Sequence, residues 1–300
     1  MFPVEQFIAQ FSDKTIALSV YDLESGREIN VHADESFHPA STVKVHVMME
    51  IFHQAEQGKI SLEERISIYN SFVSMADGSP FSLSVEDDSE KSLYERIGET
   101  ETVRELTRLM IVRSSNLATN ILLDKIGSDN INAFLESLNI RSVAVRRGMY
   151  DLAALRSGIN NSASARGLTQ TMRLLTEGKV LSEQASAEMV RILSEQEFNE
   201  SIPALLPKSV KVAHKTGWSD EFYHDTGIVY PENRKPYVIS IMTKGFPEDN
   251  ENDAHDCMAK ISKMVYEEMI NPKSNYATVS GIASWRASRH EAMTELRELT

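Results

Sequence analysis

Apolar and polar positions alternate at the two ends of the chain, which predicts strands there, whereas the middle has the periodicity of helices. Residues 15–22 alternate apolar and β-branched side chains, and residues 28–33 resume this pattern after a turn at Gly26, so we expect a hairpin. The same signal returns late in the chain, between turn sequences, in residues 210–215, 226–230 and 237–243. The two ends of the chain must therefore meet to form one sheet.

Helical periodicity dominates the rest of the chain. Residues 41–57 are apolar on nearly every face and end before Gly58, which is typical of a buried helix. Residues 70–92 are polar and rich in serine, and we expect them to form a surface excursion. Further helices are expected over residues 3–11, 102–112, 117–126, 131–138, 167–176, 183–196 and 254–270.

This order of elements predicts an α/β (α+β) fold with an antiparallel sheet flanked by helices and an all-helical lobe. We expect one domain over residues 1–270, followed by a C-terminal extension over residues 271–300. Within the domain, the α/β lobe would combine residues 1–57 and 197–270, and the helical lobe would take residues 58–196. Ligands prefer the cleft between lobes, so we expect the functional site at this junction.

Composition limits the partners of the chain. Its net charge of −13 argues against a nucleic-acid partner, because phosphate backbones select basic surfaces. Its single cysteine, Cys257, excludes a disulfide scaffold and a Cys-rich zinc site, and we expect it in the core. No membrane-length apolar run and no signal sequence are visible, so we expect no membrane association. The expected location is cytoplasmic, or secreted if a leader has been removed.

The segment Ser41-Thr42-Val43-Lys44 supplies a candidate nucleophile and base. Ser41 stands at the start of the buried helix, and Lys44 follows one turn later on the same face. A lysine beside a hydroxyl can act as a base when burial lowers its pKa, and N–H groups at a helix start can hold an oxyanion. Lys44 interrupts an otherwise apolar helix, where a free lysine would be costly. The alternative is a serine cap with a solvated lysine.

Two segments compete as the middle motif. Residues 128–130 spell Ser-Asp-Asn, but they follow a glycine that ends one helix and precede another helix, so we interpret them as a connection whose Ser or Asp caps the next helix. Residues 114–116 spell Ser-Ser-Asn between two apolar helices, where polar groups need partners. We assign Ser114 to relay a proton to the leaving group and Asn116 to hold a substrate amide. The alternative is a cap at a helix break.

The segment Lys215-Thr216-Gly217 ends a predicted strand. An edge strand offers backbone groups to a peptide-like substrate, and Lys215 and Thr216 offer a charge and a hydroxyl to a carboxylate. Gly217 lets a ligand approach the backbone, and the N–H of Trp218 would be the second oxyanion donor with that of Ser41. The alternative is a charged strand end before a turn.

These motifs, in this order, resemble those of the class A β-lactamase and penicillin-binding serine hydrolase family. The resemblance extends over residues 114–123 (SSNLATNILL), 198–203 (FNESIP) and 214–218 (HKTGW), and covers about residues 12–270. It implies the β-lactamase/transpeptidase-like fold, an acyl-enzyme on Ser41 and a small-molecule substrate. It also implies that neither a metal nor an organic cofactor is needed.

The chain departs from this family at the group that hydrolyses the acyl-enzyme. Class A β-lactamases carry a glutamate and then a Leu-Asn pair on a loop before the helix that corresponds to residues 167–176, and this glutamate activates the deacylating water. Residues 141–170 contain no glutamate, and their one carboxylate is Asp151, which we expect to cap a helix or to pair with Arg156. Without a positioned base, deacylation would be slower by ~10²–10⁴. Ser115 replaces the usual Asp of the middle motif, a change that we expect to be mild.

The sequence thus predicts a serine hydrolase that forms an acyl-enzyme with β-lactams or related amides and esters. Two alternatives use the same residues. One is a D-Ala-type peptidase or esterase, and the other is a non-hydrolytic β-lactam-binding or sensor module that stays acylated. His46 and His214 are expected to pack rather than to catalyse. Nothing in the sequence sets the oligomeric state.

Overall fold

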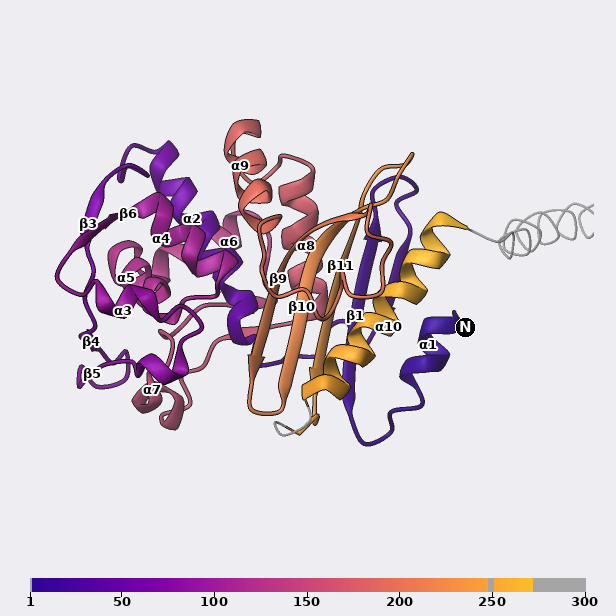
Figure 1. Ribbon diagram of the computed structural model, residues 1–300, viewed down its shortest axis with the longest axis horizontal. Helices are drawn as coiled ribbons and strands as arrows, with labels where there is room; N and C mark the ends of the chain where they lie inside the picture. Colours follow the sequence, from indigo (N-terminus) through magenta and orange to yellow (C-terminus); the bar gives the residue numbers. More distant parts are fainter. Residues whose placement is uncertain (1, 248–250, 272–300) are drawn as a thin grey trace, which may run out of the picture.

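The computed structural model describes residues 2–247 and 251–271, and a five-stranded antiparallel sheet lies at its centre. In the order β2-β1-β11-β10-β9, the sheet brings the two ends of the chain together (Figure 1). The hairpin and the single sheet expected from the sequence are therefore confirmed. The expected extension over residues 271–300 lies outside the described residues, except for Asn271. The strands are β1 (Thr15–Asp22), β2 (Glu28–Val31), β9 (Lys211–Ser219), β10 (Phe222–Tyr230) and β11 (Tyr237–Lys244).

Helices cover both faces of the sheet (Figure 1). Helices α1 (Pro3–Ile8) and α10 (Glu251–Ile270) lie on one face, and α8 (Ala165–Thr176) packs against β1, β10 and β11 on the other. Strand alternation separates the two cores: Leu18 of β1 packs toward α1 and α10, whereas Ala17 faces the opposite core. Although α8 lies in the range expected for the helical lobe, its apolar face is buried against the sheet.

A second group of helices packs around α2 (Lys44–Glu56), which is buried along most of its length (Figure 1). This matches the buried helix predicted from an apolar pattern on nearly every face. Its first turn is a separate 3-10 turn, η1 (Ala40–Val43), so regular α-helix begins three residues later than expected. The helices that contact α2 are α4 (Val103–Val112), α5 (Asn116–Ile126), α6 (Ser128–Ser137) and α9 (Glu183–Leu193).

Short elements complete the fold. Three two-stranded ladders pair β3 with β6, β4 with β5 and β7 with β8, and the expected excursion over residues 70–92 contains one of them. Their bounds are β3 (Arg65–Ser67), β4 (Phe72–Val73), β5 (Pro80–Phe81), β6 (Thr100–Thr102), β7 (Val143–Ala144) and β8 (Ser162–Ala163). The remaining turns and helices are η2 (Val85–Asp87), α3 (Ser92–Glu95) and α7 (Leu152–Arg156). Among the described residues, no helix has both the length and the apolar character needed to cross a membrane.

Two local predictions need correction. Strand β9 runs to Ser219 rather than ending at Lys215, because β10 pairs with it up to the turn at Asp220; the Lys-Thr-Gly motif thus lies inside the strand. The literal Ser-Asp-Asn forms the first turn of α6 and does not cap it. Gly127, with φ of 77°, ends α5 and is itself the N-cap of α6, a backbone conformation that suits glycine.

A row of small polar side chains crosses the sheet beneath α8. Thr169 of α8 donates to the carbonyl oxygen of Ser19 (3.0 Å), and its hydroxyl lies 2.9 Å from Ser240 Oγ. Ser240 Oγ also lies 2.7 Å from Thr226 Oγ1. These contacts attach α8 to the three central strands by polar groups that are fully buried. The row of cross-strand neighbours is Asn30, Ser19, Ser240, Thr226 and Lys215.

Removing the hydroxyl of Thr169 tests whether this row fastens α8 to the sheet. Thr169→Val keeps the shape but leaves a buried carbonyl without its donor, so we expect a loss of about 1–3 kcal/mol in the free energy of unfolding. The control is Thr176→Val, because the hydroxyl of Thr176 donates within its own helix at a partly exposed position; about 0.5 kcal/mol or less is expected. Urea denaturation measures both, and an equal loss in the two variants would contradict the assignment.

Candidate active site

Segments far apart in the sequence meet between α2 and the edge strand β9. Lys44 Nζ donates to the carbonyl oxygen of Ser114 (2.6 Å) and to Asn116 Oδ1 (2.8 Å), and lies 3.3 Å from Ser114 Oγ. Lys215 Nζ reaches the same hydroxyl from the other side, at 3.0 Å, and donates to Thr216 O at 2.9 Å. The hydroxyl of Ser114 therefore lies between two buried amino groups, and residues of the three motifs are brought together.

Ser41 lies on η1, one turn before Lys44, and its backbone faces β9. A Cβ added to Gly217 would lie 2.8 Å from the backbone nitrogens of both Ser41 and Thr42, so only glycine lets the strand approach this turn. The residue before the serine, Ala40, has a left-handed φ of 46°. Such strain in a non-glycine residue costs about 1–3 kcal/mol and is concentrated at functional sites. The proposed nucleophile is thus held by a strained turn against the strand.

The turn that carries Ser114 is also strained and is fixed by its neighbours. Ser114 has φ of 55°, and Ser115 caps α5 by accepting the N–H of Ala118 at 3.1 Å. A buried carboxylate from outside the motif, Asp88, accepts the N–H of Leu117 at 2.8 Å. Sequence reasoning did not identify Asp88, because nothing in its local sequence indicates that it would reach the start of α5.

Burial changes the protonation of both lysines. It lowers the pKa of Lys44 from its ordinary value of 10.5 to about 7, against an opposing effect of the charge on Asp88. Burial also lowers the pKa of Lys215 well below its ordinary value; Lys44 adds to this decrease, and Asp225 opposes it. The three oxygens around Lys44 Nζ match the three N–H donors of an ammonium, and a pKa of about 7 gives a neutral form near neutral pH as well.

The rest of the third motif presents polar groups to the open edge of the sheet. Because the carbonyl of Thr216 accepts Lys215 Nζ, it points away from β10, and strand alternation turns the N–H of Trp218 toward the same side. Thr216 Oγ1 is buried without a hydrogen-bond partner among the described residues. The Trp218 side chain is 40% exposed and packs edge-on against Phe198, with ring centroids 5.1 Å apart. The Thr216 hydroxyl thus has no partner among the described residues, and the N–H of Trp218 faces the open edge of the sheet.

A loop behind the site is fixed by Asn120, which sequence reasoning missed. Its Oδ1 accepts the N–H of Met149 at 2.7 Å, and its Nδ2 donates to the carbonyl of Met149 at 2.9 Å. A Cβ on Gly148 would come within 2.9 Å of Asn120 Oδ1, so this close approach needs glycine. Asn120 lies one helical turn after Asn116, and that spacing was the signal available in the sequence. Met149 is thereby held near the residue that binds Lys44.

Asp151, the single carboxylate of this loop, has a structural role. It caps α7 by accepting the N–H of Ala154 at 3.0 Å, which confirms the expected capping role; its partners do not include Arg156. Its two carboxylate oxygens also accept Ser74 Oγ at 2.7 Å and the N–H of Met75 at 2.9 Å. With 1% exposure, the carboxylate is fully engaged in holding two loops together.

Three other predictions concerned residues outside the site. His46 is buried, and its Nε2 contacts Thr171 Oγ1 at 2.9 Å, so it packs toward α8 as expected. Burial lowers its pKa to about 4. Cys257 is buried on α10, which confirms the expected core position. His214 also lies in the interior, where it forms a hydrogen-bonded pair with Asp225.

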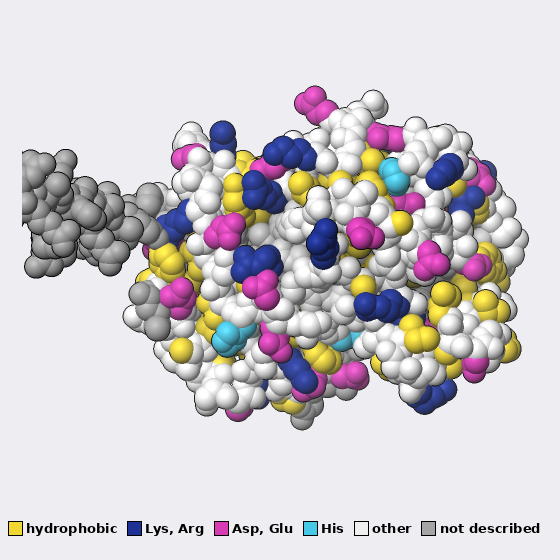
Figure 2. Space-filling model, turned by 180° about the vertical axis from the view of Figure 1, so that it is seen from behind, with side chains coloured by type: hydrophobic (Ala, Val, Ile, Leu, Met, Phe, Trp, Pro, Cys, Tyr) yellow, Lys and Arg dark blue, Asp and Glu magenta, His cyan; other side chains and the backbone are white. Residues whose placement is uncertain are grey.

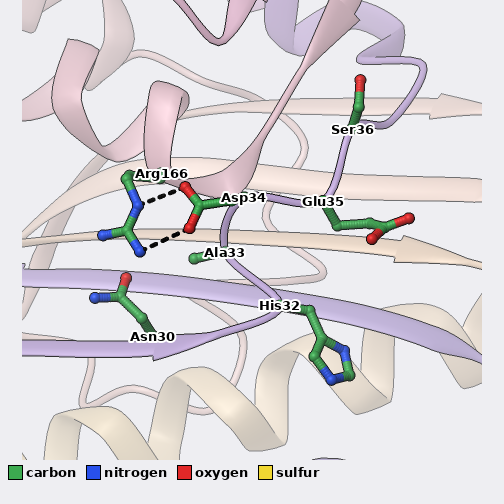
Figure 3. Close-up of a pocket in the computed structure, with 7 residues that line it drawn as sticks. All are labelled: Asn30, His32, Ala33, Asp34, Glu35, Ser36 and Arg166. Atoms are coloured by element: carbon green, nitrogen blue, oxygen red, sulfur yellow. Dashed lines mark hydrogen bonds and ion pairs between the residues drawn. The ribbon is translucent and has the colours of Figure 1, made fainter.

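An open surface hollow of about 500 Å³ lies elsewhere, between β2 and the start of α8 (Figure 3). Arg166 donates to both carboxylate oxygens of Asp34 there, at 2.6 and 3.0 Å, so these two charges of the hollow are already paired with each other. The hollow contains none of the predicted site residues. Figure 2 shows that, on the face it presents, Lys and Arg side chains are dispersed among Asp and Glu.

Comparisons with known proteins identify the family and the fold of the chain. A family model described as the β-lactamase enzyme family matches residues 3–269. The β-lactamase CTX-M-97 of Escherichia coli is 29% identical over 255 residues, which are 83% of this chain and 82% of that protein. BRO-1 of Moraxella catarrhalis is 25% identical over 80% of this chain and 75% of its own length. The solved structure of PBP-A aligns with a TM-score of 0.75 at 25% identity, over 89% of this chain and 94% of that one. The predicted fold and family resemblance are confirmed.

The lowered pKa of Lys44 makes a prediction about stability. Between about pH 7 and 10.5 the unfolded chain binds a proton at Lys44 that the folded protein does not, so stability rises with pH in this window. Relative to Lys44→Met, which has no such group, the free energy of unfolding of the wild type should increase by up to about 1.4 kcal/mol per pH unit. Lys215 is present in both proteins, and because Lys44 adds to the decrease in its pKa, the part that does not cancel has the same sign. Urea titrations at several pH values measure this difference, and a constant difference would show that Lys44 has an ordinary pKa.

Proposed function

The chain belongs to the β-lactamase enzyme family, and on this premise we propose that β-lactams acylate Ser41 and that the acyl-enzyme hydrolyses slowly. The observation that carries the proposal is the convergence of Lys44 and Lys215 on the Ser114 hydroxyl, next to the turn that holds Ser41. In this arrangement Ser41 would be the nucleophile, Lys44 the base, Ser114 the proton relay and Lys215 the cation.

Acylation uses neutral Lys44 as the base. Lys44 takes the proton of Ser41 Oγ while this oxygen attacks the lactam carbonyl, and the negative charge moves to the carbonyl oxygen. The backbone N–H groups of Ser41 and Trp218 hold that oxyanion. The C–N bond of the lactam then breaks, and the proton passes from Lys44 through Ser114 Oγ to the departing nitrogen. The left-handed backbone of Ser114 aims its hydroxyl between the two lysines, which suits this relay.

Substrate binding uses the groups at the open edge of β9. The ammonium of Lys215 and the unused hydroxyl of Thr216 bind the carboxylate of the β-lactam. The Nδ2 of Asn116 donates to Asp87 O at 3.0 Å, and since an amide nitrogen carries two hydrogens it can also donate to a substrate amide. Gly217 keeps the strand close enough to η1 for these groups to act together.

Slow deacylation follows from the loop that Asn120 holds. The one carboxylate of this loop belongs to Asp151, which is buried. It caps α7 and contacts a second loop, so it is not available to activate water. The loop residue that Asn120 fixes is Met149, whose side chain cannot act as a base. This absence of a base also favours a second candidate function, a module that is acylated once and stays acylated. A D-Ala-type peptidase or esterase would use the same residues for acylation. A panel of peptides and esters would identify its substrate.

Mass spectrometry with benzylpenicillin tests the nucleophile. We expect one adduct per chain on Ser41, and none in Ser41→Ala. With a chromogenic cephalosporin, one equivalent should react in a rapid burst. The turnover that follows should be slower, by ~10²–10⁴, than in an enzyme with a positioned base. Ser128→Ala is the matched control, because Ser128 belongs to the literal Ser-Asp-Asn at the start of α6 and should leave the burst unchanged. An adduct on another residue, or none with any common β-lactam, would remove Ser41 as the nucleophile.

Placing a carboxylate at Met149 tests why deacylation is slow. The Asn120 contacts involve only the backbone of Met149, so Met149→Glu should keep the loop in place. We expect deacylation to accelerate by ~10² or more, with little change in acylation. Met75→Glu, at a residue that is 55% exposed, is the control and should change neither step. If Met149→Glu folds and is acylated but does not turn over faster, the loop position is not where a base acts.

A further inference from the structure

Residues 87–90, with the sequence Asp-Asp-Ser-Glu, lie against the turn that carries Ser114, and the proposed mechanism does not use them. This 87–90 segment connects η2 to α3, which packs beside α5 (Figure 1). Two of its carboxylates are buried although it belongs to the polar excursion: Asp88 is 3% exposed and Glu90 is 2% exposed. Burying a carboxylate is costly unless it is paired or hydrogen-bonded, so the partners of these two show what the segment does.

The first half of the segment binds the start of α5. The carbonyl oxygen of Asp87 accepts Asn116 Nδ2 at 3.0 Å, and Asp88 Oδ2 accepts the N–H of Leu117 at 2.8 Å. Because the Nδ2 of Asn116 faces Asp87, its Oδ1 is directed to Lys44 Nζ, 2.8 Å away. The segment therefore determines which end of this amide meets the lysine.

The second half binds the residue that precedes Ser114. Ser89 Oγ donates to the carbonyl oxygen of Arg113 at 2.6 Å, and Arg113 Nη1 donates to Glu90 Oε2 at 2.8 Å. The Nε of the same guanidinium donates to Glu197 Oε2 at 3.0 Å, so Arg113 has a carboxylate on each side. Ser114 itself has the left-handed φ of 55°, a conformation that persists only where its surroundings determine it. Contacts on both sides of the residue provide such surroundings.

Asp88 must be a carboxylate, because both of its oxygens accept backbone N–H groups. Oδ1 accepts the N–H of Glu90 at 3.0 Å, whereas Oδ2 accepts that of Leu117. Tyr94 of α3 donates its hydroxyl to Oδ2 at 3.0 Å, and Ser115 Oγ lies 3.5 Å from the same oxygen. An amide has one acceptor oxygen and one donor nitrogen, so an asparagine would leave one of the two N–H groups without its acceptor.

The position of the Ser114 hydroxyl depends on what fixes this turn. Ser114 lies between the end of α4 and the start of α5, where the backbone leaves helical geometry. Its Oγ is 3.3 Å from Lys44 Nζ and 3.0 Å from Lys215 Nζ, so a small rotation of the turn alters both contacts. Proton transfer requires the two heavy atoms to be within hydrogen-bond reach of each other.

We propose that the 87–90 segment holds the Ser114 turn against Lys44, and that the carboxylate of Asp88 is the group on which this hold depends. Asp88 is a positioning residue, because it touches no reacting atom and acts through Leu117 and the start of α5. The inference rests on the acylation of Ser41 proposed above. It concerns the delivery of the proton to the leaving group and not the binding of the substrate.

Comparing two leaving groups isolates this effect. In Asp88→Asn, the second-order rate constant for acylation by benzylpenicillin should fall about tenfold or more, since a misplacement of about 1 Å can cost ~10²-fold. The constant for p-nitrophenyl acetate should fall much less, because its phenolate leaves without a proton. Equal losses for the lactam and the ester would show a merely structural role and overturn the proposal.

The control for Asp88→Asn is Glu86→Gln. It removes a charge from the neighbouring turn η2 at an exposed side chain, and it should change neither rate constant. A loss in Glu86→Gln as large as in Asp88→Asn would overturn the proposal.

A double-mutant cycle tests whether Asp88 acts through Ser114. Ser114→Ala removes the relay itself, so adding Asp88→Asn to it should slow the reaction with benzylpenicillin little further. Two losses that multiply in full would show that Asp88 acts elsewhere and overturn the proposal.

Ser89→Ala tests the segment if Asp88→Asn does not fold. Ser89 is exposed, and its loss removes one hydrogen bond to the turn without removing a charge. Acylation by benzylpenicillin should slow roughly threefold, which corresponds to one ordinary hydrogen bond. A Ser89→Ala variant that is acylated as fast as the wild type would overturn the hold.

Amide hydrogen exchange measures the hold without any reaction. In Asp88→Asn, the backbone N–H of Glu90 or that of Leu117 should exchange faster than in the wild type, because one of them has lost its acceptor. Unchanged exchange at both would overturn the role of Asp88. If exchange accelerates as expected but benzylpenicillin does not acylate Ser41 in the wild type, the proposed function fails while the hold on the turn stands.

Discussion

Two lysine amino groups buried around one serine hydroxyl are the constraint on which the rest of the site depends. Amines in the interior are tolerable when they are neutral or when carboxylates compensate them. The chain does both: the pKa of Lys44 is close to neutrality, and Asp88 and Asp225 favour the charged forms of the two lysines. The burial that makes these amines costly for the folded chain is also what lowers the pKa of Lys44, and perturbed pKa values of this kind are concentrated at functional sites.

The sheet provides the rigidity that this constraint requires. Strand β9 is held on one side by β10, on its far face by the pair at His214 and Asp225, and against η1 at Gly217. Two glycines, Gly217 and Gly227, permit these contacts, one toward the nucleophile and one toward the histidine. Strain at Ala40 and Ser114 is maintained by this frame, since left-handed non-glycine residues persist only where their surroundings determine them.

Much of this arrangement was visible in the sequence, because local signals specify local structure. Alternation identified the strands, and the motifs identified the residues that meet, from Lys44 to Lys215. The sequence could not show that Asn120 would clamp Met149 or that Asp225 would lie behind Lys215, since both depend on the packing and register of distant segments. The end of β9 was misplaced for the same reason: its last residues are strand only because β10 pairs with them.

The open edge of β9 has a consequence for the behaviour of the protein in solution. Because β9 is the last strand of the sheet, it presents N–H and C=O groups to any other extended chain. Sheet proteins commonly mask such edges with charge, proline or a bulge, but masking this one would block the ligand. A small molecule bound along this edge would cover these groups, so the protein without a ligand is expected to be the form more exposed to strand-to-strand aggregation.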